Sequence, residues 1–257
     1  MTAGAIPRLV AHRGYAARFP ENSLEGIAAA LQAGAWYVEF DVQLTADGVP
    51  VLSHDADLSR SCRMPGSLLE MDYAAVSRLS AGEPGRFGDR FAAARIGTLT
   101  QAMALVAETD AAAAFVEVKV ESLERFGVEA VTSTVLAELA PYPGRFTVIS
   151  FERAAVERAR ASAGVPTGWV LPAYDGATRA AARSLAPEFL FCNHRKLPPG
   201  DAPLWNGPWR WALYEVSDPA LALALAQRGA TLIETFAIGD MLADPALAAA
   251  ARPVARA

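Results

Sequence analysis

Short β-rich runs alternate with longer segments of helical spacing along nearly the whole chain, and this alternation constrains the fold more than any other feature. The expected strands are residues 8–12, 37–43, 115–120, 146–150, 168–171, 189–193, 211–216 and 231–235. The expected helices are residues 23–33, 98–108, 123–139, 153–163, 176–185, 219–228 and 238–250. The pattern predicts a parallel sheet covered by helices.

Eight strands in 257 residues are typical of a closed (β/α)8 TIM barrel. We therefore expect one barrel domain over residues 1–257. Residues 45–48 read Thr-Ala-Asp-Gly, which predicts a hairpin turn that extends the second strand through residues 49–53. The following residues 56–96 are rich in Gly, Pro, Arg and Ser and are expected to form a small insertion that covers the barrel mouth.

Composition excludes several classes of protein. A chain that is 53% hydrophobic and 20% charged is neither disordered nor fibrous. A net charge of -5 with no basic run makes nucleic acid an unsuitable partner. No apolar run reaches the roughly 18 residues of a membrane span, so no stable membrane insertion is expected. Without an export signal, the expected compartment is the cytoplasm. The sequence predicts no oligomeric state.

Two of the three histidines follow strands that should end at the same mouth. His12 ends the first strand in His12-Arg13-Gly14, and His54 ends the hairpin extension beside Asp55. A single histidine is more often structural, but two at one barrel mouth indicate acid/base chemistry.

Carboxylates alternate with apolar residues in two neighbouring strands. Because side chains alternate between the faces of a strand, Glu39 and Asp41 should both point into the barrel. Glu117 in the next strand extends the pair to a trio of oxygen ligands. Uncompensated carboxylates in an apolar interior are costly, and a hard divalent cation compensates them well. The alternative for Glu39 and Asp41 is a solvent-facing strand.

Lys119 lies one pleat nearer the mouth than Glu117, where it can serve an anionic substrate, although a simple Glu117–Lys119 pair is the alternative. Together with Arg13, this set describes a site for an anion that also binds a metal. Phosphate esters fit it best, and carboxylate substrates fit it less well.

The motifs that carry this chemistry are His12-Arg13-Gly14, Pro20-Glu21-Asn22-Ser23, Glu39-Phe40-Asp41-Val42, Thr45-Ala46-Asp47-Gly48, His54-Asp55 and Glu117-Val118-Lys119. In order and spacing they strongly resemble those of the glycerophosphodiester phosphodiesterases, over about residues 8–239. The resemblance implies a TIM barrel with an insertion after the second strand. It also implies metal-dependent hydrolysis of glycerophosphodiesters to an alcohol and sn-glycerol 3-phosphate.

The resemblance further implies a role for each matching residue. Glu39, Asp41 and Glu117 would bind one divalent cation, Ca²⁺ or Mg²⁺. His12 and His54 would be the acid/base pair, with His12 favoured as base and His54 as acid. Arg13 and Lys119 would hold the phosphate, and Glu21 and Asn22 would orient the first loop.

The chain departs from the family pattern near its last two strands. Glu215 follows Tyr214, and Glu234 precedes Thr235-Phe236 where relatives carry Thr-Asp. If either carboxylate faces the barrel, we expect it to pair with Lys119 or to disfavour a second anionic group on the substrate.

Three alternative functions fit parts of this pattern. A phospholipase D or sphingomyelinase-like phosphodiesterase shares the histidines and carboxylates, but residues 56–96 lack the apolar rim that intact lipids need. A metal amidohydrolase would want a His-x-His pair, which the first strand does not have. A catalytically inactive binding barrel would tolerate loss of either histidine.

Overall fold

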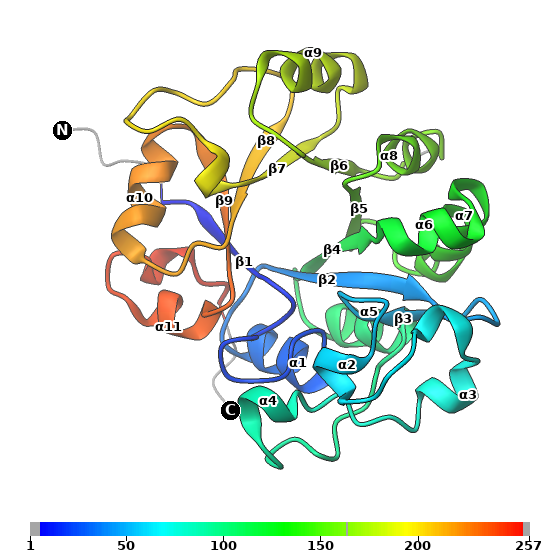
Figure 1. Ribbon diagram of the computed structural model, residues 1–257. Helices are drawn as coiled ribbons and strands as arrows, with labels where there is room; N and C mark the ends of the chain where they lie inside the picture. Colours follow the sequence, from blue (N-terminus) through cyan, green and yellow to red (C-terminus); the bar gives the residue numbers. More distant parts are fainter. Residues whose placement is uncertain (1–5, 163, 254–257) are drawn as a thin grey trace.

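The computed structural model describes residues 6–162 and 164–253, and within them eight parallel strands close into a barrel (Figure 1). The barrel strands are β1 (Arg8–Ala11), β2 (Tyr37–Leu44), β4 (Ala113–Val118), β5 (Phe146–Ser150), β6 (Thr167–Val170), β7 (Phe189–Asn193), β8 (Arg210–Tyr214) and β9 (Ala230–Thr235). β1 closes the barrel by pairing with both β2 and β9. The predicted TIM barrel is confirmed.

Side chains alternate along each strand between two apolar cores, one between the barrel and its helices and one inside the barrel. Val38 and Phe40 of β2 are buried against the helices that surround the barrel. Inside the barrel, Phe115 packs edge-on against Phe189 and Phe191, with ring centroids 5.1 and 5.0 Å apart. These aromatic rings fill the interior, so polar side chains collect above them, toward the carboxyl ends of the strands.

The outer helices are α1 (Leu24–Gln32), α5 (Leu99–Glu108), α6 (Val120–Phe126), α7 (Val128–Leu139), α8 (Arg153–Arg160), α9 (Gly176–Leu185), α10 (Pro219–Gln227) and α11 (Ile238–Ala243). Side chains cap the start of α1, α5, α8, α9 and α10. Ser23 caps α1 by accepting a hydrogen bond from the Gly26 amide, and Thr98 with Gln101 forms a capping box at α5. Such caps satisfy amides that the first turn leaves unpaired.

Two predicted helices differ from the structure. Residues 123–139 were expected to form one helix, but Gly127, with φ of 89°, separates α6 from α7. The helix expected over residues 238–250 ends at Ala243, and a short turn of 3₁₀ helix, η3 (Ala248–Ala250), follows the interruption at Asp244-Pro245. The predicted helix end at residue 163 lies outside the described residues.

The predicted hairpin and the segment after it are both present. β3 (Pro50–Leu52) pairs antiparallel with the end of β2, and Gly48 supplies the positive φ of the turn. The expected insertion then forms the short helices α2 (Ser59–Cys62), η1 (Leu68–Glu70), α3 (Tyr73–Val76) and α4 (Pro84–Phe87). It has a small core of its own around Leu58, Leu68 and Val76. Figure 1 shows these helices, in cyan and blue-green, beside α1 and β3.

Across the described residues, the helices are all too short or too polar to cross a bilayer.

Candidate active site

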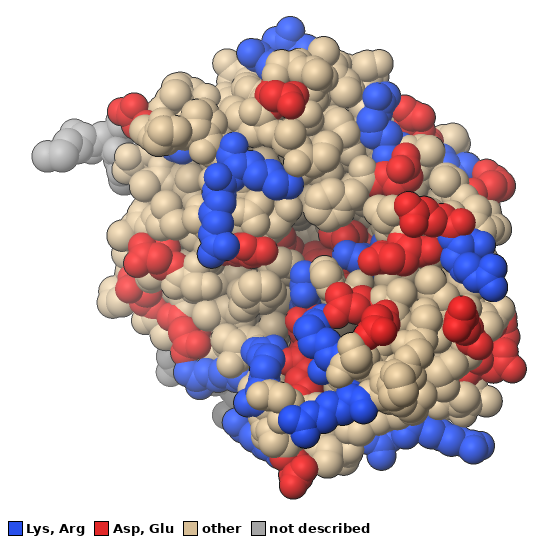
Figure 2. Space-filling model, in the orientation of Figure 1, with Lys and Arg blue, Asp and Glu red and all other residues tan. Residues whose placement is uncertain are grey.

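A cavity of about 250 Å³ opens at the carboxyl ends of the barrel strands. It is lined by His12, Arg13, Glu39, Asp41, His54, Glu117, Lys119, Ile149, Phe151, Val170, Phe191, Asn193, Lys196, Tyr214, Glu215 and Glu234. Figure 2 shows Lys, Arg, Asp and Glu side chains gathered around the hollow near the middle of this face. Seven of the nine side chains assigned from the sequence therefore line one cavity, and Glu21 and Asn22 lie behind it.

His12 is buried directly after β1. Its ring stacks on Phe236, with centroids 4.3 Å apart and planes inclined by 8°. Nε2 lies 3.9 Å from Glu39 Oε2. Burial, with a contribution from the charge of Arg13, lowers the pKa of His12 well below its usual value. Burial therefore favours the neutral form of the imidazole.

The loop after β1 has a conformation that few residues adopt. Arg13 and Asn22 have φ of 54° and 55°, in the left-handed region. In this conformation the Arg13 amide donates to Glu39 Oε2 over 3.0 Å, and the Asn22 amide donates to the Arg13 carbonyl over 3.0 Å. The Asn22 side chain donates to Asp41 Oδ2 over 2.9 Å and accepts from the Asp41 amide over 3.0 Å. Asn22 thus ties the loop to β2.

The Arg13 guanidinium lies between two carboxylates. Nη1 is 3.2 Å from Glu21 Oε2, and Nε is 3.2 Å from Asp41 Oδ2. Although burial disfavours the charge, Asp41 and Glu21 outweigh it and raise the pKa of Arg13. Glu21 therefore contacts a permanent cation at the cavity, and its role in orienting the first loop stays a prediction.

Lys119 lies between Asp41 and Glu117, two of the three predicted metal ligands. Its Nζ lies 2.9 Å from Glu117 Oε1 and 3.3 Å from Asp41 Oδ1. The Glu117–Lys119 pair that the sequence left as an alternative is thus present. Burial works against ionisation of Asp41, but Lys119 and Arg13 outweigh it and hold the pKa of Asp41 below its usual range. Burial raises the pKa of Glu117.

Glu39, Asp41 and Glu117 are arranged to hold a cation. One ligand oxygen from each lies within 4.8 Å of the others, and all three residues are buried. Glu39 Oε1 has no hydrogen-bond partner among the described residues. Burial and the neighbouring carboxylates, Asp41 first, raise the pKa of Glu39 well above its usual value. A buried set of carboxylate oxygens with one orphaned atom fits a hard divalent ion.

His54 faces the cavity from the segment after β3 and is held by a series of hydrogen bonds between charged side chains. Its Nδ1 lies 2.6 Å from Asp55 Oδ1, and Asp55 Oδ2 accepts from Arg60 Nε over 2.6 Å. Arg60, on α2, also donates to Glu21. Partial burial opposes ionisation of Asp55, but hydrogen bonds from Arg60 and His54 hold its pKa below the usual range. Arg60 therefore connects the loops that carry the two histidines.

Glu215 and Glu234, the two carboxylates that differ from the family pattern, both line the cavity, but neither pairs with Lys119. Of the two possibilities that the sequence offered, pairing with Lys119 is wrong, because Lys119 pairs with Glu117 on β4 and with Asp41 on the adjacent β2. Glu215 instead lies 3.6 Å from Arg195 in an ion pair at the rim. Glu234 is 2% exposed, and burial raises its pKa well above the usual value.

Sequence reasoning missed three residues that shape the site. Arg60 lies in a segment without recognisable periodicity, so nothing marked it as a partner of Glu21. Phe236, just after β9, and Tyr214, the last residue of β8, contact the His12 ring. Their positions at the ends of these strands were the available signal, since residues at the carboxyl ends of barrel strands face the mouth.

Comparison with solved structures finds the same fold. A phosphodiesterase from Oleispira antarctica, solved in complex with the product sn-glycerol-3-phosphate, superposes with a TM-score of 0.79 over 92% of this chain and 95% of that chain, at 24% identity. A glycerophosphoryl diester phosphodiesterase from Silicibacter pomeroyi gives a TM-score of 0.78 over 95% of both chains, at 24% identity.

Relatives in sequence share the amino-acid pattern over shorter spans. A glycerophosphodiester phosphodiesterase from Caldanaerobacter subterraneus subsp. tengcongensis is 35% identical over 102 residues, which are 40% of this chain and 41% of the relative. One from Bacillus altitudinis is 32% identical over 125 residues, 48% of this chain and 50% of the relative. The alignments thus span half or less of each relative's length.

The family model for the glycerophosphoryl diester phosphodiesterase family matches residues 12–199, well over half of the chain. This range begins at His12 and contains all nine residues assigned to the site from the sequence. The chain belongs to the glycerophosphoryl diester phosphodiesterase family.

Proposed function

We propose that this protein is a metal-dependent phosphodiesterase that hydrolyses glycerophosphodiesters to an alcohol and sn-glycerol 3-phosphate. The observation that carries the proposal is the convergence of two histidines, three carboxylates, an arginine and a lysine on one barrel cavity, in a chain of this family. The Oleispira relative, solved with sn-glycerol-3-phosphate as product, supports the same glycerol phosphate product.

In this proposal Glu39, Asp41 and Glu117 hold one divalent cation, Ca²⁺ or Mg²⁺, because all three offer hard carboxylate oxygens. When bound, the cation stabilises negative charge on the phosphate. Arg13 and Lys119 bind non-bridging phosphate oxygens, and Arg13 suits two oxygens at once. Both side chains are held rigidly by carboxylates, which limits the reorganisation needed when substrate enters.

The histidines transfer the protons. His12, kept neutral by burial, accepts a proton from the nucleophile as its oxygen bonds to phosphorus. The phosphorus–oxygen bond to the alcohol breaks, and His54 gives that alcohol oxygen a proton. Because Asp55 holds Nδ1 of His54, Nε2 is the nitrogen that exchanges it. The nucleophile is water, or the adjacent glycerol hydroxyl in a route through a cyclic phosphate.

The surface favours water-soluble diesters over intact lipids. Among the described residues, Ile6 is the one exposed large hydrophobic side chain. It precedes β1 and therefore lies at the end of the barrel opposite the cavity. A lipid-cleaving phosphodiesterase would need apolar residues around the mouth. The cytoplasmic compartment stays a prediction from the sequence.

The test is glycerol 3-phosphate release after metal removal and replacement. The protein is stripped with a chelator, and Ca²⁺, Mg²⁺ or Mn²⁺ is added singly with glycerophosphocholine or with an intact lysophospholipid. We expect release from glycerophosphocholine with at least one metal. His12→Ala and His54→Ala should each lower kcat by about a hundredfold or more. No release with any metal would contradict the proposal.

A further inference from the structure

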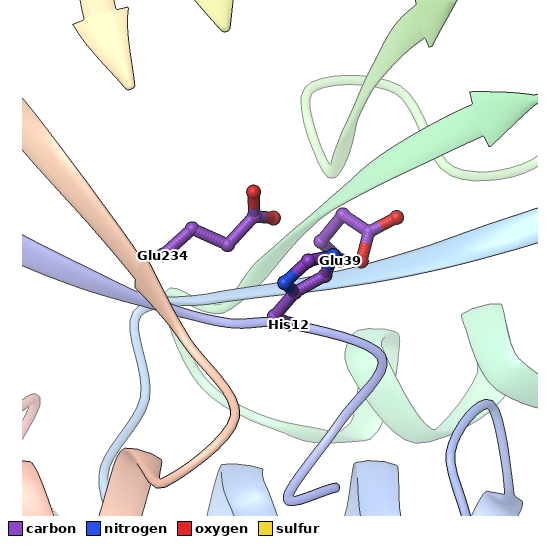
Figure 3. Close-up of side chains that lie close together, drawn as sticks. All are labelled: His12, Glu39 and Glu234. Carbon is purple, nitrogen blue, oxygen red and sulfur yellow. Dashed lines mark ion pairs between the residues drawn. The ribbon is translucent and has the colours of Figure 1, made fainter. Parts of the chain in front are cut away.

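Three residues where β1, β2 and β9 meet each have a buried side-chain atom without a hydrogen-bond partner among the described residues. Glu234 Oε1, Glu39 Oε1 and His12 Nδ1 are buried and have no hydrogen-bond partner among the described residues. Figure 3 shows the Glu234 carboxylate extending from β9 toward the His12 ring and Glu39. One ligand atom from each of the three residues lies within 4.8 Å of the others.

The protein's own cations do not satisfy this cluster. Lys119 pairs with Asp41 and Glu117, and the Arg13 guanidinium lies between Asp41 and Glu21. Glu234 and Glu39 are each 2% exposed, so bulk water does not solvate them either. A buried carboxylate left in this way is costly when ionised, so it either keeps a proton or binds a cation.

We propose that His12, Glu39 and Glu234 form a second cation position, which shares Glu39 with the position at Asp41 and Glu117. Its donor set differs from that of the first. One imidazole and two carboxylates suit a borderline ion such as Zn²⁺, whereas three carboxylates suit Ca²⁺ or Mg²⁺. With Glu234, the second position therefore favours zinc, whereas the first position, at Glu39, Asp41 and Glu117, favours a harder metal.

The second position has a consequence that rests on the proposed function. An ion bound to His12 occupies a ring nitrogen, and the imidazole can then no longer accept a proton from the nucleophile. Zinc should therefore inhibit the enzyme that carries Ca²⁺ or Mg²⁺ at the first position. The inhibition would be relieved by loss of Glu234, the member of the set that serves neither the first position nor the proposed proton transfer.

Binding is measured directly, apart from activity. The calcium-loaded protein is dialysed to equilibrium against increasing Zn²⁺, and both metals are counted by mass spectrometry. We expect about one zinc per chain with calcium retained, and at least about tenfold weaker zinc binding for Glu234→Gln. Glu215→Gln is the matched control, because it removes a carboxylate from the same cavity and should leave zinc affinity unchanged.

Two histidine variants test the ligand set. His12→Ala should lose the zinc, and His54→Ala should retain it. Circular dichroism and thermal melting confirm that each variant is folded before its zinc content is interpreted. Zinc binding that is absent in the wild type, or equal in the wild type and Glu234→Gln, overturns the proposal.

Inhibition distinguishes this proposal from the proposed function. Zinc should lower the rate of the calcium-loaded wild type, and Glu234→Gln should need at least about tenfold more zinc for the same fractional loss of its own rate. If zinc binds through Glu234 but no metal supports hydrolysis, the second position stands and the proposed function fails. If hydrolysis occurs and zinc does not bind, the proposed function stands and the second cation position fails.

Discussion

Two consecutive residues with positive φ, Arg13 and Gly14, turn the chain back at the end of β1. The turn lets the Arg13 amide reach the carboxylate of Glu39. It also brings Gly14 against α1, where a Cβ on Gly14 would lie 2.8 Å from the Gly26 carbonyl carbon and 2.8 Å from the Ile27 nitrogen. The glycine in the His-Arg-Gly motif is therefore required by contact as well as by its dihedral angle.

Replacing Gly14 by Ala should destabilise the protein and disturb His12. The left-handed φ alone costs a Cβ about 1–2 kcal/mol, and the clash with the α1 backbone adds about 1–3 kcal/mol. Gly48→Ala is the control, since Gly48 has φ of 80° but nothing within 4 Å of its Cβ position. Urea unfolding should show the larger loss for Gly14→Ala, and equal losses would contradict this account.

At the scale of elements, the insertion after β3 contacts the loop after β1 through Arg60 on α2 and through Glu83 and Arg86 at α4. Its core is separate from that of the barrel. Arg60 on α2 connects it to the site by donating to Asp55 and Glu21. Through these two carboxylates Arg60 acts on His54 and on Arg13 without lining the cavity itself. We interpret Arg60 as a positioning residue.

Arg60→Ala should lower kcat/KM by about tenfold or more with little loss of stability. Loss of an outer partner of a site typically costs activity on this scale, whereas a partly exposed ion pair contributes at most about 1 kcal/mol to folding. Arg78→Ala is the control, because Arg78 is exposed in the same insertion. Steady-state kinetics and thermal melting are compared, and an unchanged kcat/KM would exclude the positioning role.

The sequence predicts strands and helices correctly where the local pattern of apolar and polar residues determines them. The strands fall within about two residues of expectation because alternation along β2 and β4 reflects burial on two faces. The prediction of one helix over residues 123–139 is wrong because Gly127 ends α6 within an otherwise continuous apolar pattern. The contact between Arg60 and Glu21 has no local signature, since the two residues are 39 positions apart.

At the scale of the whole molecule, closure of the barrel completes the site. β9 pairs with β1 so that Val10 lies opposite Glu234, which brings Glu234 into the cavity next to His12. Sequence alone located His12, Glu39, Asp41 and Glu117 because motifs mark them. It identified Glu234 as a departure from the family pattern but not its neighbours, since these depend on how the two ends of the sheet meet.

Without metal, the stability of the protein should fall as pH rises above about 6.5. Glu39 and Glu234 have raised pKa values, so the folded state keeps protons that the unfolded chain has already lost. His12, with a lowered pKa, opposes this trend only below its unfolded value of 6.5.

The measurement is the melting temperature between about pH 7 and pH 8.5, with chelator or with Ca²⁺. Calcium should raise the melting temperature and should do so more at the higher pH, because it compensates the carboxylates as they ionise. Glu234→Gln in chelator should show a smaller decline than the wild type. A melting temperature in chelator that rises with pH would contradict the prediction.

The pairing of β1 with β9 also has a consequence for synthesis on the ribosome. The first strand is made more than 200 residues before its last neighbour, and until then it has one partner, β2. A nascent chain therefore carries an open sheet edge and no complete pocket until β9 emerges. Translation that stops upstream of β9 should yield an inactive, aggregation-prone product rather than a weaker enzyme.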